Sequence, residues 1–578
     1  MSTLWDSIVF SDIAERIATD PEARFWDENE DGEPIDLEDD NIKRFFSDFL
    51  PVVGIFNYPE QDAKGIPNYK PIFHYKKRIE FINPKQMEVL IRKILQEAGY
   101  EKVNALFHFK KSQFFSESAS TSIQLLEGKS ILRDKKDSAF RFFCNGYVEI
   151  TSDKVTDALS FSTLPEDALI WNDTVIARDY TSIDLEKATG FDTHFRDFVE
   201  NLTRTDDGDL DPHALERLKI VIGYMCHRFH RESQRKCVIL IDRPTDENFF
   251  DRSNGGTGKG LLIRSLSQIV NTITINGKAF KSTSEDRFAL AGVTESHELV
   301  NFDDASDKFD FESIFPHITG DFHVRRMRQN PTTIPGERAP KIVITTNHRI
   351  DGSDTSHRRR QVVIEISPYY RLQLEEYGMT PEDIHGGKEL CGDEWDDNDW
   401  SEYYRFVFEC IQLYLSKGLP KSSEESILYK RSRFVSKCGS AILLDSILAV
   451  LEEASANDEE WFCEQFYQRI RLMVPLVLQS DSVLLGLLKE IAKDFGYTFN
   501  AHKNGNIDKV RLTDQRWNKW LSLGLDKQGK KIGTVYQKDD RVSAFRIGLS
   551  ESAVNQSTEL DSVANTEIHK SLERSYRE

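Results

Sequence analysis

The spacing of hydrophobic and polar positions changes along the chain, and it predicts where helices and strands lie. Within residues 212–231, apolar residues recur at helical spacing, at Leu215, Leu218, Ile222 and Met225. Residues 237–241 form a short, continuous apolar run that predicts a buried strand. From residue 261 to about 367, such runs alternate with helical stretches. This alternation predicts a doubly wound α/β domain with a mostly parallel sheet.

The segment before this domain has a mixed pattern and predicts a mixed α+β domain over residues 1–205. A hairpin is expected at Asn145-Gly146, between two short apolar stretches. Aromatic and basic residues interleave at 73–78 and 107–111. Such interleaving is typical of a half-buried strand, and the alternative is a nucleic-acid surface built from stacking and charge. We favour the strand at both places.

Behind the α/β domain, the chain is mainly helical. A helix is expected from Trp400 to Leu419, with Gly418 as its stop. A further hairpin is expected at Asn504-Gly505, and the last thirty or so residues are polar and aperiodic, as in a disordered tail. The carboxyl-terminal domain is expected to be helical and could include a winged helix. The predicted divisions are 1–205, 206–370 for the α/β core, 371–440 for a helical extension with an acidic loop, 441–548 and 549–578.

Composition narrows the possible partners and compartments. The 578 residues carry a formal net charge of −21, which disfavours sequence-independent binding of nucleic acid over the whole surface. The acids gather at 27–40 and 393–399, so a local basic channel remains compatible with this charge. The seven cysteines form no C-x-x-C pair, which argues against a disulfide framework or zinc ribbon. No apolar run approaches the roughly 18 residues of a membrane span. We therefore expect a cytoplasmic protein with no membrane partner.

A glycine-rich stretch with one lysine, Ser253-Asn-Gly-Gly-Thr-Gly-Lys-Gly260, follows the strand at 237–241. A strand, a glycine turn and a helix start can bind phosphates, because backbone N–H groups turn inward and the lysine reaches the outer phosphates. The motif departs from G-x-x-x-x-G-K-[ST] at Ser253 and at Gly260, where a Mg²⁺-binding hydroxyl is usual. A flexible surface loop is the alternative. The predicted nucleotide-binding residues are Asn254, Gly255, Gly256, Thr257, Gly258, Lys259 and Gly260.

Two later apolar strands end in polar residues that suit the same site. The first ends at Asp303 and Asp304; Asp303 would hold Mg²⁺, and Asp304 could orient or deprotonate the attacking water. The second ends at Asn347, which could contact the γ-phosphate or that water. Ligands bind at the carboxyl edge of open α/β sheets, so these side chains are expected to converge there.

Arginines follow at Arg358 and Arg359, before a further apolar strand. In a ring of subunits, one of them could reach a neighbour's γ-phosphate and stabilise transition-state charge. A surface patch is the alternative. Such a finger acting between subunits needs a closed ring with head-to-tail contacts.

This ordered set over 212–367 resembles the superfamily 3 helicase domain, a branch of the AAA+ ATPases. It is most similar to the helicase half of phage, plasmid and poxvirus primase-helicases. Residues 221–225, 280–290 and 400–419 carry further likeness. The resemblance implies a P-loop core with ATP and Mg²⁺ as cofactors, a hexameric ring, and replication of a phage or mobile element. The hydrolytic residues would be Lys259, Asp303, Asp304 and Asn347, with Arg358 or Arg359 as the finger.

The family also places a DNA-gripping hairpin between the acidic strand and the asparagine strand. Here that span carries Arg325, Arg326 and Arg328, which would contact phosphates of single-stranded or forked DNA. An ordinary cationic hairpin is the alternative. The acidic run at 27–40 lacks flanking strands, so we expect the helicase half without a primase centre, with a primase or other replication protein as a partner.

Two departures from the family pattern keep other functions open. Gly260 provides no hydroxyl for Mg²⁺, for which Thr257 is a possible substitute, and Asp304 stands where glutamate is more common. An ATP-gated DNA-binding or initiator scaffold with weak hydrolysis is one alternative, and Gly260 favours it. A AAA+ protein that remodels other proteins is the second.

Overall fold

The computed structural model describes residues 10–499 with gaps at 36, 63–64, 183–192, 232–233, 246–254, 283, 285, 329, 351–354, 421–425, 458–460 and 496, and also strand residues 534–536, 541–545 and 547–549. The chain forms two compact units, residues 1–243 with 253–424, and residues 244–252 with 425–578. The hairpin expected at Asn504-Gly505 and the tail after residue 549 lie outside the described residues.

A five-stranded parallel sheet forms the centre of the first unit. Its order is β10-β11-β14-β9-β15 and every neighbouring pair is parallel. The sheet confirms the predicted α/β class. Strand β9 is buried at every residue, as expected for a strand covered on both faces. The strands are β9 (Cys237–Asp242), β10 (Thr272–Asn276), β11 (Leu299–Ala305), β14 (Lys341–Thr346) and β15 (Gln361–Ile366).

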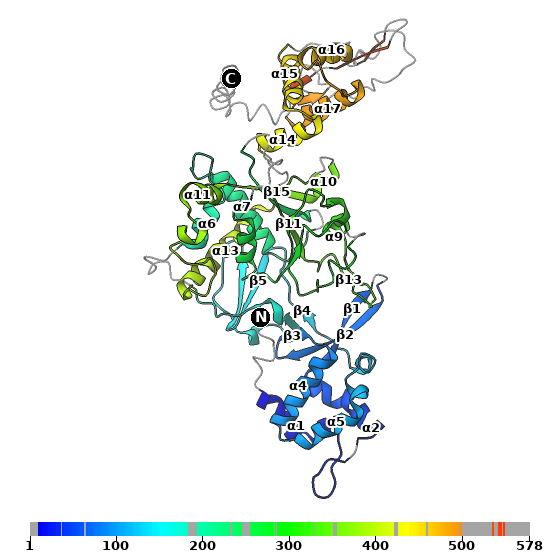
Figure 1. The fold of residues 1–578 in the computed structure, drawn as a ribbon. Helices are drawn as coiled ribbons and strands as arrows, with labels where there is room; N and C mark the ends of the chain where they lie inside the picture. The colour runs from blue at the N-terminus through cyan, green and yellow to red at the C-terminus, as the bar shows by residue number, and fades with distance from the viewer. Residues whose placement is uncertain are drawn as a thin grey trace. The chain divides into compact units, whose positions relative to one another are not determined.

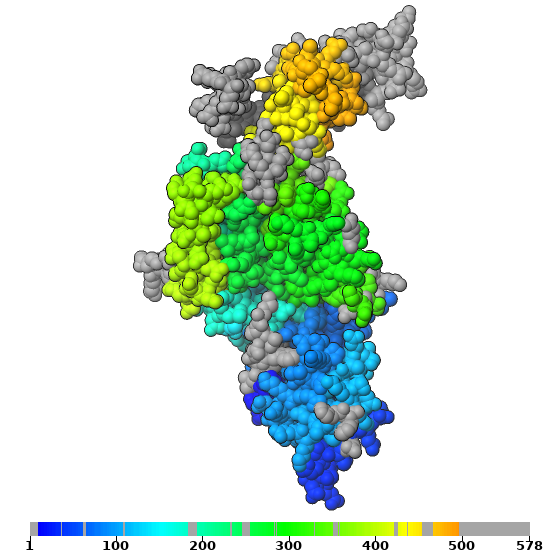
Figure 2. All heavy atoms as spheres, viewed as in Figure 1, coloured from blue at the N-terminus to red at the C-terminus, as the bar shows by residue number. Residues whose placement is uncertain are grey.

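Helices cover this sheet (Figure 1), and several of them share its apolar core. The predicted helix at 212–231 is confirmed as α7 (Pro212–Met225), which begins at Asp211 because that carboxylate accepts the N–H groups of the first turn. The helix α13 (Asp397–Lys417) ends at Gly418, with φ +72°, as predicted. Figure 2 shows the segment with α11 to α13 as a yellow-green layer beside the green sheet region. The others here are α6 (His194–Asn201), α8 (Lys259–Leu266), α9 (Phe315–Thr319), α10 (Thr355–Arg360), α11 (Tyr369–Tyr377) and α12 (Pro381–Ile384).

A second sheet joins the amino-terminal part to the parallel-sheet region. Its order is β12-β13-β1-β2-β3-β7-β4. The hairpin β12–β13, which lies in sequence between β11 and β14, pairs antiparallel with β1 at Gln61↔Thr333 and Asp62↔Thr332. The strands are β1 (Ile55–Asp62), β2 (Pro67–Tyr75), β3 (Arg78–Phe81), β4 (Ser130–Ile131), β7 (Ala168–Trp171), β12 (Phe322–Val324) and β13 (Thr332–Ile334).

The amino-terminal helices (Figure 1) enclose a separate core rich in phenylalanine, in which Phe25, Phe45 and Phe107 are fully buried. The strand interpretation of residues 73–78 is confirmed for Phe73–Tyr75, which end β2, whereas the same interpretation of 107–111 is wrong. Those residues belong to α5, because Phe107 and Phe114 lie two turns apart and bury one helical face. The helices are α1 (Phe10–Thr19), α2 (Asp39–Arg44), α3 (Leu50–Val53), α4 (Pro84–Glu97) and α5 (Glu101–Phe114).

The predicted hairpin at Asn145-Gly146 is confirmed. Strands β5 (Ser138–Phe143) and β6 (Gly146–Thr151) pair antiparallel, and β8 (Val175–Ile176) lies beside β5. Phe143 and Val148 enter the same core as the parallel sheet and α13. This part of the first 205 residues therefore packs with the α/β core.

The second unit is mainly helical among its described residues. Four helices enclose Phe434, Leu444, Phe466 and Leu488. They are α14 (Ile427–Cys438), α15 (Ala441–Asn457), α16 (Cys463–Met473) and α17 (Asp481–Asp494), with short strands β16 (Trp461–Phe462), β17 (Tyr497–Phe499), β18 (Thr534–Tyr536), β19 (Arg541–Phe545) and β20 (Ile547–Leu549). In the described part of the chain, no helix combines the length and apolar character that a membrane crossing needs.

Candidate functional site

The ends of three parallel strands meet the glycine-rich loop at the carboxyl edge of the five-stranded sheet. Strand β9 ends at Asp242, β11 carries Asp303 and Asp304 near its end, and Asn347 follows β14. Because β14 lies between β9 and β11, its end lies between the loop that follows β9 and the two acids of β11. This strand order brings Asp303, Asp304 and Asn347 to the same edge of the sheet as the glycine-rich loop.

Lys259, the first residue of α8, is buried with 7% of its surface exposed. Its ammonium forms an ion pair with Asp242 Oδ1 and donates to Thr257 Oγ1 at 3.1 Å and to Asn347 Oδ1 at 2.8 Å. These three acceptors match the three hydrogens of an ammonium group. Burial lowers the pKa of Lys259, and the negative charges of Asp242 and Asp304 oppose that shift. The structure thus places the ammonium of Lys259 against the ends of β9 and β14.

Asp242 is a site residue that the sequence analysis missed. Its side chain is fully buried, and its Oδ1 accepts the Thr257 hydroxyl as well as Lys259. Its second oxygen, Oδ2, has no hydrogen-bond partner among the described residues. A buried carboxylate requires a compensating charge, which Lys259 provides. The position of Asp242 after the apolar run 237–241 is a sequence signal of the same kind as that of Asp303, which lies near the end of β11.

Gly258 and Gly260 of the glycine loop differ in what a side chain would meet. Gly258 has φ +98°, and a Cβ there would lie 2.9 Å from Leu202 Cδ2 and 3.3 Å from a ring carbon of Phe198. A Cβ at Gly260 would meet nothing within 4 Å. A serine side chain at residue 260 would therefore fit. Asn254 and Ser253 lie outside the described residues.

The two acids of β11 have different partners. Asp303 Oδ1 accepts the Thr345 hydroxyl at 2.8 Å, and the same hydroxyl oxygen accepts the backbone N–H of Asp304 at 2.8 Å. Asp304 has φ +53°, a sparsely populated conformation for a residue with a side chain. Its carboxylate pairs with exposed Lys278 at 2.5 Å, and this hydrogen bond raises the pKa of the lysine. The left-handed turn thus gives neighbouring acids separate environments.

The candidate finger arginines lie on α10. Arg359 is exposed, and Arg358 belongs to the helix, although its side chain is outside the described set. The next residue, Arg360, points inward, since it donates to Ser356 Oγ at 2.6 Å and stacks over Phe315. A further arginine that the sequence analysis missed, Arg371 on α11, lies close enough for its charge to lower the pKa of Lys259.

The three arginines predicted to bind DNA divide into two kinds. Arg326 is half-buried and donates to the carbonyls of Ala291 and Val293, at 3.0 and 2.7 Å. Arg325 and Arg328 are exposed on the connection between β12 and β13, on either side of Met327, which is 69% exposed. Arg326 therefore anchors the hairpin, while the other two present their charges to solvent. Their DNA role stays a prediction.

The oxygen atoms of this site are of the kind that Mg²⁺ prefers. Asp242 offers an unpartnered buried carboxylate oxygen, and Asp303 and Thr257 offer further oxygens. Within the described ranges, no group of three or more His, Cys, Asp or Glu residues forms a ready metal cage. Protein sites commonly bind Mg²⁺ through one or two carboxylates together with substrate phosphates. The residues here fit that pattern.

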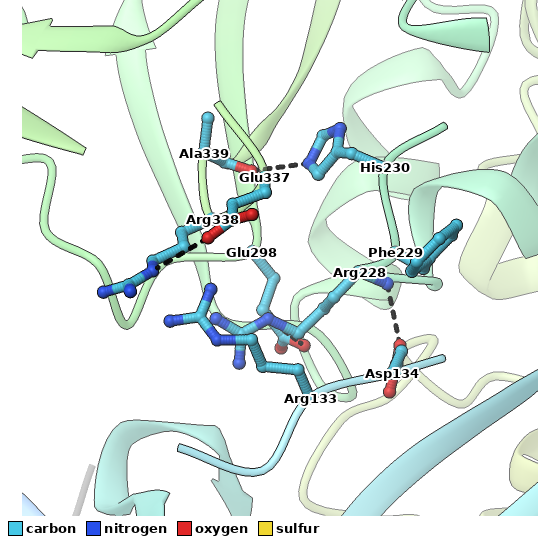
Figure 3. Close-up of a pocket in the computed structure, with 9 residues that line it drawn as sticks. All are labelled: Arg133, Asp134, Arg228, Phe229, His230, Glu298, Glu337, Arg338 and Ala339. Atoms are coloured by element: carbon cyan, nitrogen blue, oxygen red, sulfur yellow. Dashed lines mark hydrogen bonds and ion pairs between the residues drawn. The ribbon is translucent and has the colours of Figure 1, made fainter. Parts of the chain in front are cut away.

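A second charged cluster lies at the amino edge of the same sheet (Figure 3). There, Arg133, Arg228 and Arg338 line a pocket of about 270 Å³ with Asp134 and Glu298. Arg228 lies 3.6 Å from Glu298, and Arg133 pairs with nearby Glu295, as Arg338 does at 3.5 Å.

Fully buried Arg141 on β5 completes this amino-edge network. It lies 3.6 Å from Asp134 and 3.8 Å from Glu298. All four arginines of the network have a carboxylate within 4 Å, and the partners come from both the amino-terminal strands and the parallel-sheet region. We interpret the network as a structural joint between these regions.

Comparison with known proteins gives low similarity only. No protein-family model and no curated protein matches the chain. Among solved structures, the apo A form of the NrS-1 C-terminal region is 14% identical with a TM-score of 0.28, covering 72% of this chain and 97% of that one. A second structure, of residues 305–718 of the same protein, is 14% identical with a TM-score of 0.27, covering 71% and 96%. JCV helicase with a bound acetamide compound is 14% identical with a TM-score of 0.22, covering 44% and 64%. The functional interpretation therefore rests on the geometry of the site.

Proposed function

We propose that the chain is an ATP-dependent DNA helicase of the superfamily 3, AAA+ type, acting in replication of a phage or mobile element. The observation that carries the proposal is the buried Lys259 of the glycine loop, in contact with Asp242 and Asn347 at the sheet edge that also holds Asp303 and Asp304. A lysine next to a glycine turn and a helix start is suited to bind nucleotide phosphates.

Each residue of the site has a distinct part in this proposal. Backbone N–H groups of the loop and of the first turn of α8 would bind the inner phosphates, and Lys259 would turn toward the outer ones. Mg²⁺ bound with the nucleotide, next to Asp303, would neutralise charge on the phosphates. Asp304 would orient the attacking water after releasing Lys278, and Asn347 would contact the γ-phosphate or that water.

The proposed assembly is a hexameric ring on single-stranded or forked DNA. Arg359 is exposed on α10 and, with Arg358, is placed on the helix that leads into β15. A finger acting on the next subunit requires head-to-tail contacts that close into a ring. Exposed Arg325 and Arg328 would contact DNA phosphates independently of sequence.

The hairpin β12–β13 is joined to the nucleotide site through the two strands on either side of it in the chain. It follows β11, which carries Asp303 and Asp304, and precedes β14, which leads to Asn347. A movement of either strand end on hydrolysis would therefore be passed to the hairpin. Because β13 also pairs with β1, the amino-terminal sheet would move with it.

ATP hydrolysis with and without single-stranded DNA tests the proposal. Turnover stimulated by DNA, and lost in Lys259→Ala, is expected for a translocating motor. Lys308→Ala removes an exposed lysine of the same region and serves as the matched control. Wild-type turnover in Lys259→Ala would reject the assigned site.

An ATP-gated scaffold with weak hydrolysis is the second candidate, and the absence of a hydroxyl at Gly260 favours it. Gly260→Ser introduces the hydroxyl into open space. A large rise in turnover would favour the scaffold. An unchanged rate would mean that another group of the wild-type protein already binds Mg²⁺ in place of the hydroxyl. A protein remodeller, the third candidate, should retain its partner-stimulated ATPase after Arg325 and Arg328 are neutralised.

A further inference from the structure

The missing hydroxyl of the glycine loop raises the question of which group replaces it. Space is available at Gly260 for a larger side chain, so packing does not explain the glycine. The same cluster contains an acid outside the G-x-x-x-x-G-K-[ST] pattern, Asp242 at the end of β9. Its Oδ2 is buried and lacks a hydrogen-bond partner among the described residues, while Oδ1 accepts from Lys259 and Thr257.

Lys259 cannot keep its present contacts and also bind phosphates. All three of its ammonium hydrogens have protein acceptors, namely Asp242, Thr257 and Asn347. When Lys259 turns toward a nucleotide, fully buried Asp242 loses the one cation that pairs with it among the described residues. An uncompensated buried carboxylate is strongly unfavourable, and a second cation in place of the ammonium would stabilise it.

We propose that Asp242 exchanges one cation for another: it holds Lys259 in the nucleotide-free protein and binds the Mg²⁺ that arrives with the nucleotide, in place of the hydroxyl absent at residue 260. This inference rests on the nucleotide site proposed above. A carboxylate oxygen is a preferred Mg²⁺ ligand, and the Thr257 hydroxyl keeps the carboxylate in place.

The exchange has a measurable consequence for affinity. Without Mg²⁺, binding of nucleotide would leave Asp242 unpaired, so wild-type affinity should rise by about a hundredfold or more when Mg²⁺ is added. Asp242→Asn keeps the size of the side chain and removes its charge. Lys259 is then released, and metal-free affinity should rise about tenfold or more, while the gain from Mg²⁺ should shrink to a few-fold at most.

The test is equilibrium binding of a fluorescent, non-hydrolysable ATP analogue in EDTA and in Mg²⁺, together with Mn²⁺ binding followed by electron paramagnetic resonance. We expect Asp242→Asn to lose the metal-dependent gain and the tightly bound Mn²⁺. Adding Gly260→Ser to this variant should restore both, because the serine supplies the usual hydroxyl. Asp307→Asn, a change at an exposed acid of the same region, should behave as wild type.

Several outcomes would overturn the proposal. An unchanged metal dependence in Asp242→Asn would mean that Asp242 only pairs with Lys259. Gly260→Ser alone leaves the buried cluster intact; a large increase of the metal-dependent gain in this variant would mean that Asp242 does not replace the hydroxyl. A wild-type protein that binds no nucleotide in either condition would instead reject the proposed function itself.

Discussion

Two charged clusters lie at opposite edges of one parallel sheet, and they differ in the residue type that supplies the positive charge. At the amino edge, four arginines meet the carboxylates of Asp134, Glu295 and Glu298, which lie on the segments that lead into β5 and β11. At the carboxyl edge, a single lysine on a glycine loop faces Asp242, whose second oxygen has no hydrogen-bond partner in the described part of the chain. Both clusters therefore contain buried charge. We infer that the arginines of the amino edge keep their carboxylate partners, whereas Lys259 at the carboxyl edge can leave Asp242.

Arginine at the amino edge suits fixed pairing, and lysine at the carboxyl edge suits a change of partner. A guanidinium presents donors in a fixed fork and can hold several groups in one geometry, as that of Arg228 does with the backbone carbonyl of Glu295 and the carboxylate of Glu298. An ammonium on a flexible stem can change acceptors with a small rotation. We infer that the amino edge stabilises the fold and that the carboxyl edge binds a ligand.

The largest effect on stability is expected at the amino edge. Arg141→Met removes the fully buried cation that faces Asp134 and Glu298 and should lower the free energy of unfolding by about 3–5 kcal/mol. Nucleotide affinity of the folded fraction should stay within about twofold of wild type, a difference well below 1 kcal/mol. Urea denaturation and nucleotide titration measure the two quantities. Arg338→Met, at a more exposed site, should cost only about 1 kcal/mol. Equal effects of the two changes would contradict the assigned joint.

Low pH should lower the stability that the amino edge of the sheet contributes. Burial lowers the pKa of His227 to about 4 and that of His230 to about 3. Both are neutral in the folded protein, but in the unfolded chain they bind protons below about pH 6.5. The contribution of these two histidines to the free energy of unfolding is therefore fully present above pH 6.5 and is lost as the pH falls toward 4. The loss between pH 6.5 and 5 is on the order of 2 kcal/mol.

Thermal unfolding across this pH range measures the acid effect. His227 Nε2 lies 2.9 Å from the carbonyl of Lys135, so neutral His227 donates there. His227→Gln retains a donor without the titration and should reduce the loss at low pH. The same acid sensitivity in this variant would exclude His227 as its source.

At the carboxyl edge, two neighbouring glycines form a matched pair. Gly258→Ala places a Cβ against Leu202 and Phe198 at a left-handed φ, and it should cost about 2 kcal/mol and weaken nucleotide binding. Gly260→Ala meets open space and should be neutral or stabilising, by up to about 1 kcal/mol. Denaturant melts of both variants decide this, and a larger loss at residue 260 would contradict the loop geometry.

The smallest effects are expected at the hairpin. Arg325→Ala and Arg328→Ala should leave stability within about 0.5 kcal/mol of wild type and reduce DNA affinity, with a shallower salt dependence. Arg326→Ala should lower stability by about 1–2 kcal/mol, because it removes the contacts to Ala291 and Val293. Fluorescence anisotropy with single-stranded DNA at several salt concentrations separates the two groups.

The sequence predicted the parallel sheet and its strand ends because apolar runs and their polar ends are local signals. Asp303 and Asn347 follow this rule, and Asp242 follows it too, at the end of the apolar run 237–241. The strand interpretation of 107–111 was wrong, since five residues do not distinguish alternation from the face of a helix. The pairing of β1 with β13 joins residues far apart in sequence, and no local pattern encodes it.

The arginines show the same limit of sequence reasoning. Arg325, Arg326 and Arg328 are equivalent in a charge pattern, and only the fold shows that Arg326 donates to backbone carbonyls. Arg371 is distant from the loop in sequence, yet its charge acts on Lys259. Such relations depend on tertiary packing and could not be read from spacing.

The central claim is that Lys259 leaves its protein partners to bind nucleotide phosphates. Isothermal titration of ATP with Mg²⁺ into the wild-type protein and into Lys259→Ala tests it most directly. The account predicts one binding site per chain in the wild type and an affinity reduced by about a hundredfold or more in the variant, a loss of about 2.7 kcal/mol. Equal affinity in the two proteins, with both still folded, would contradict it.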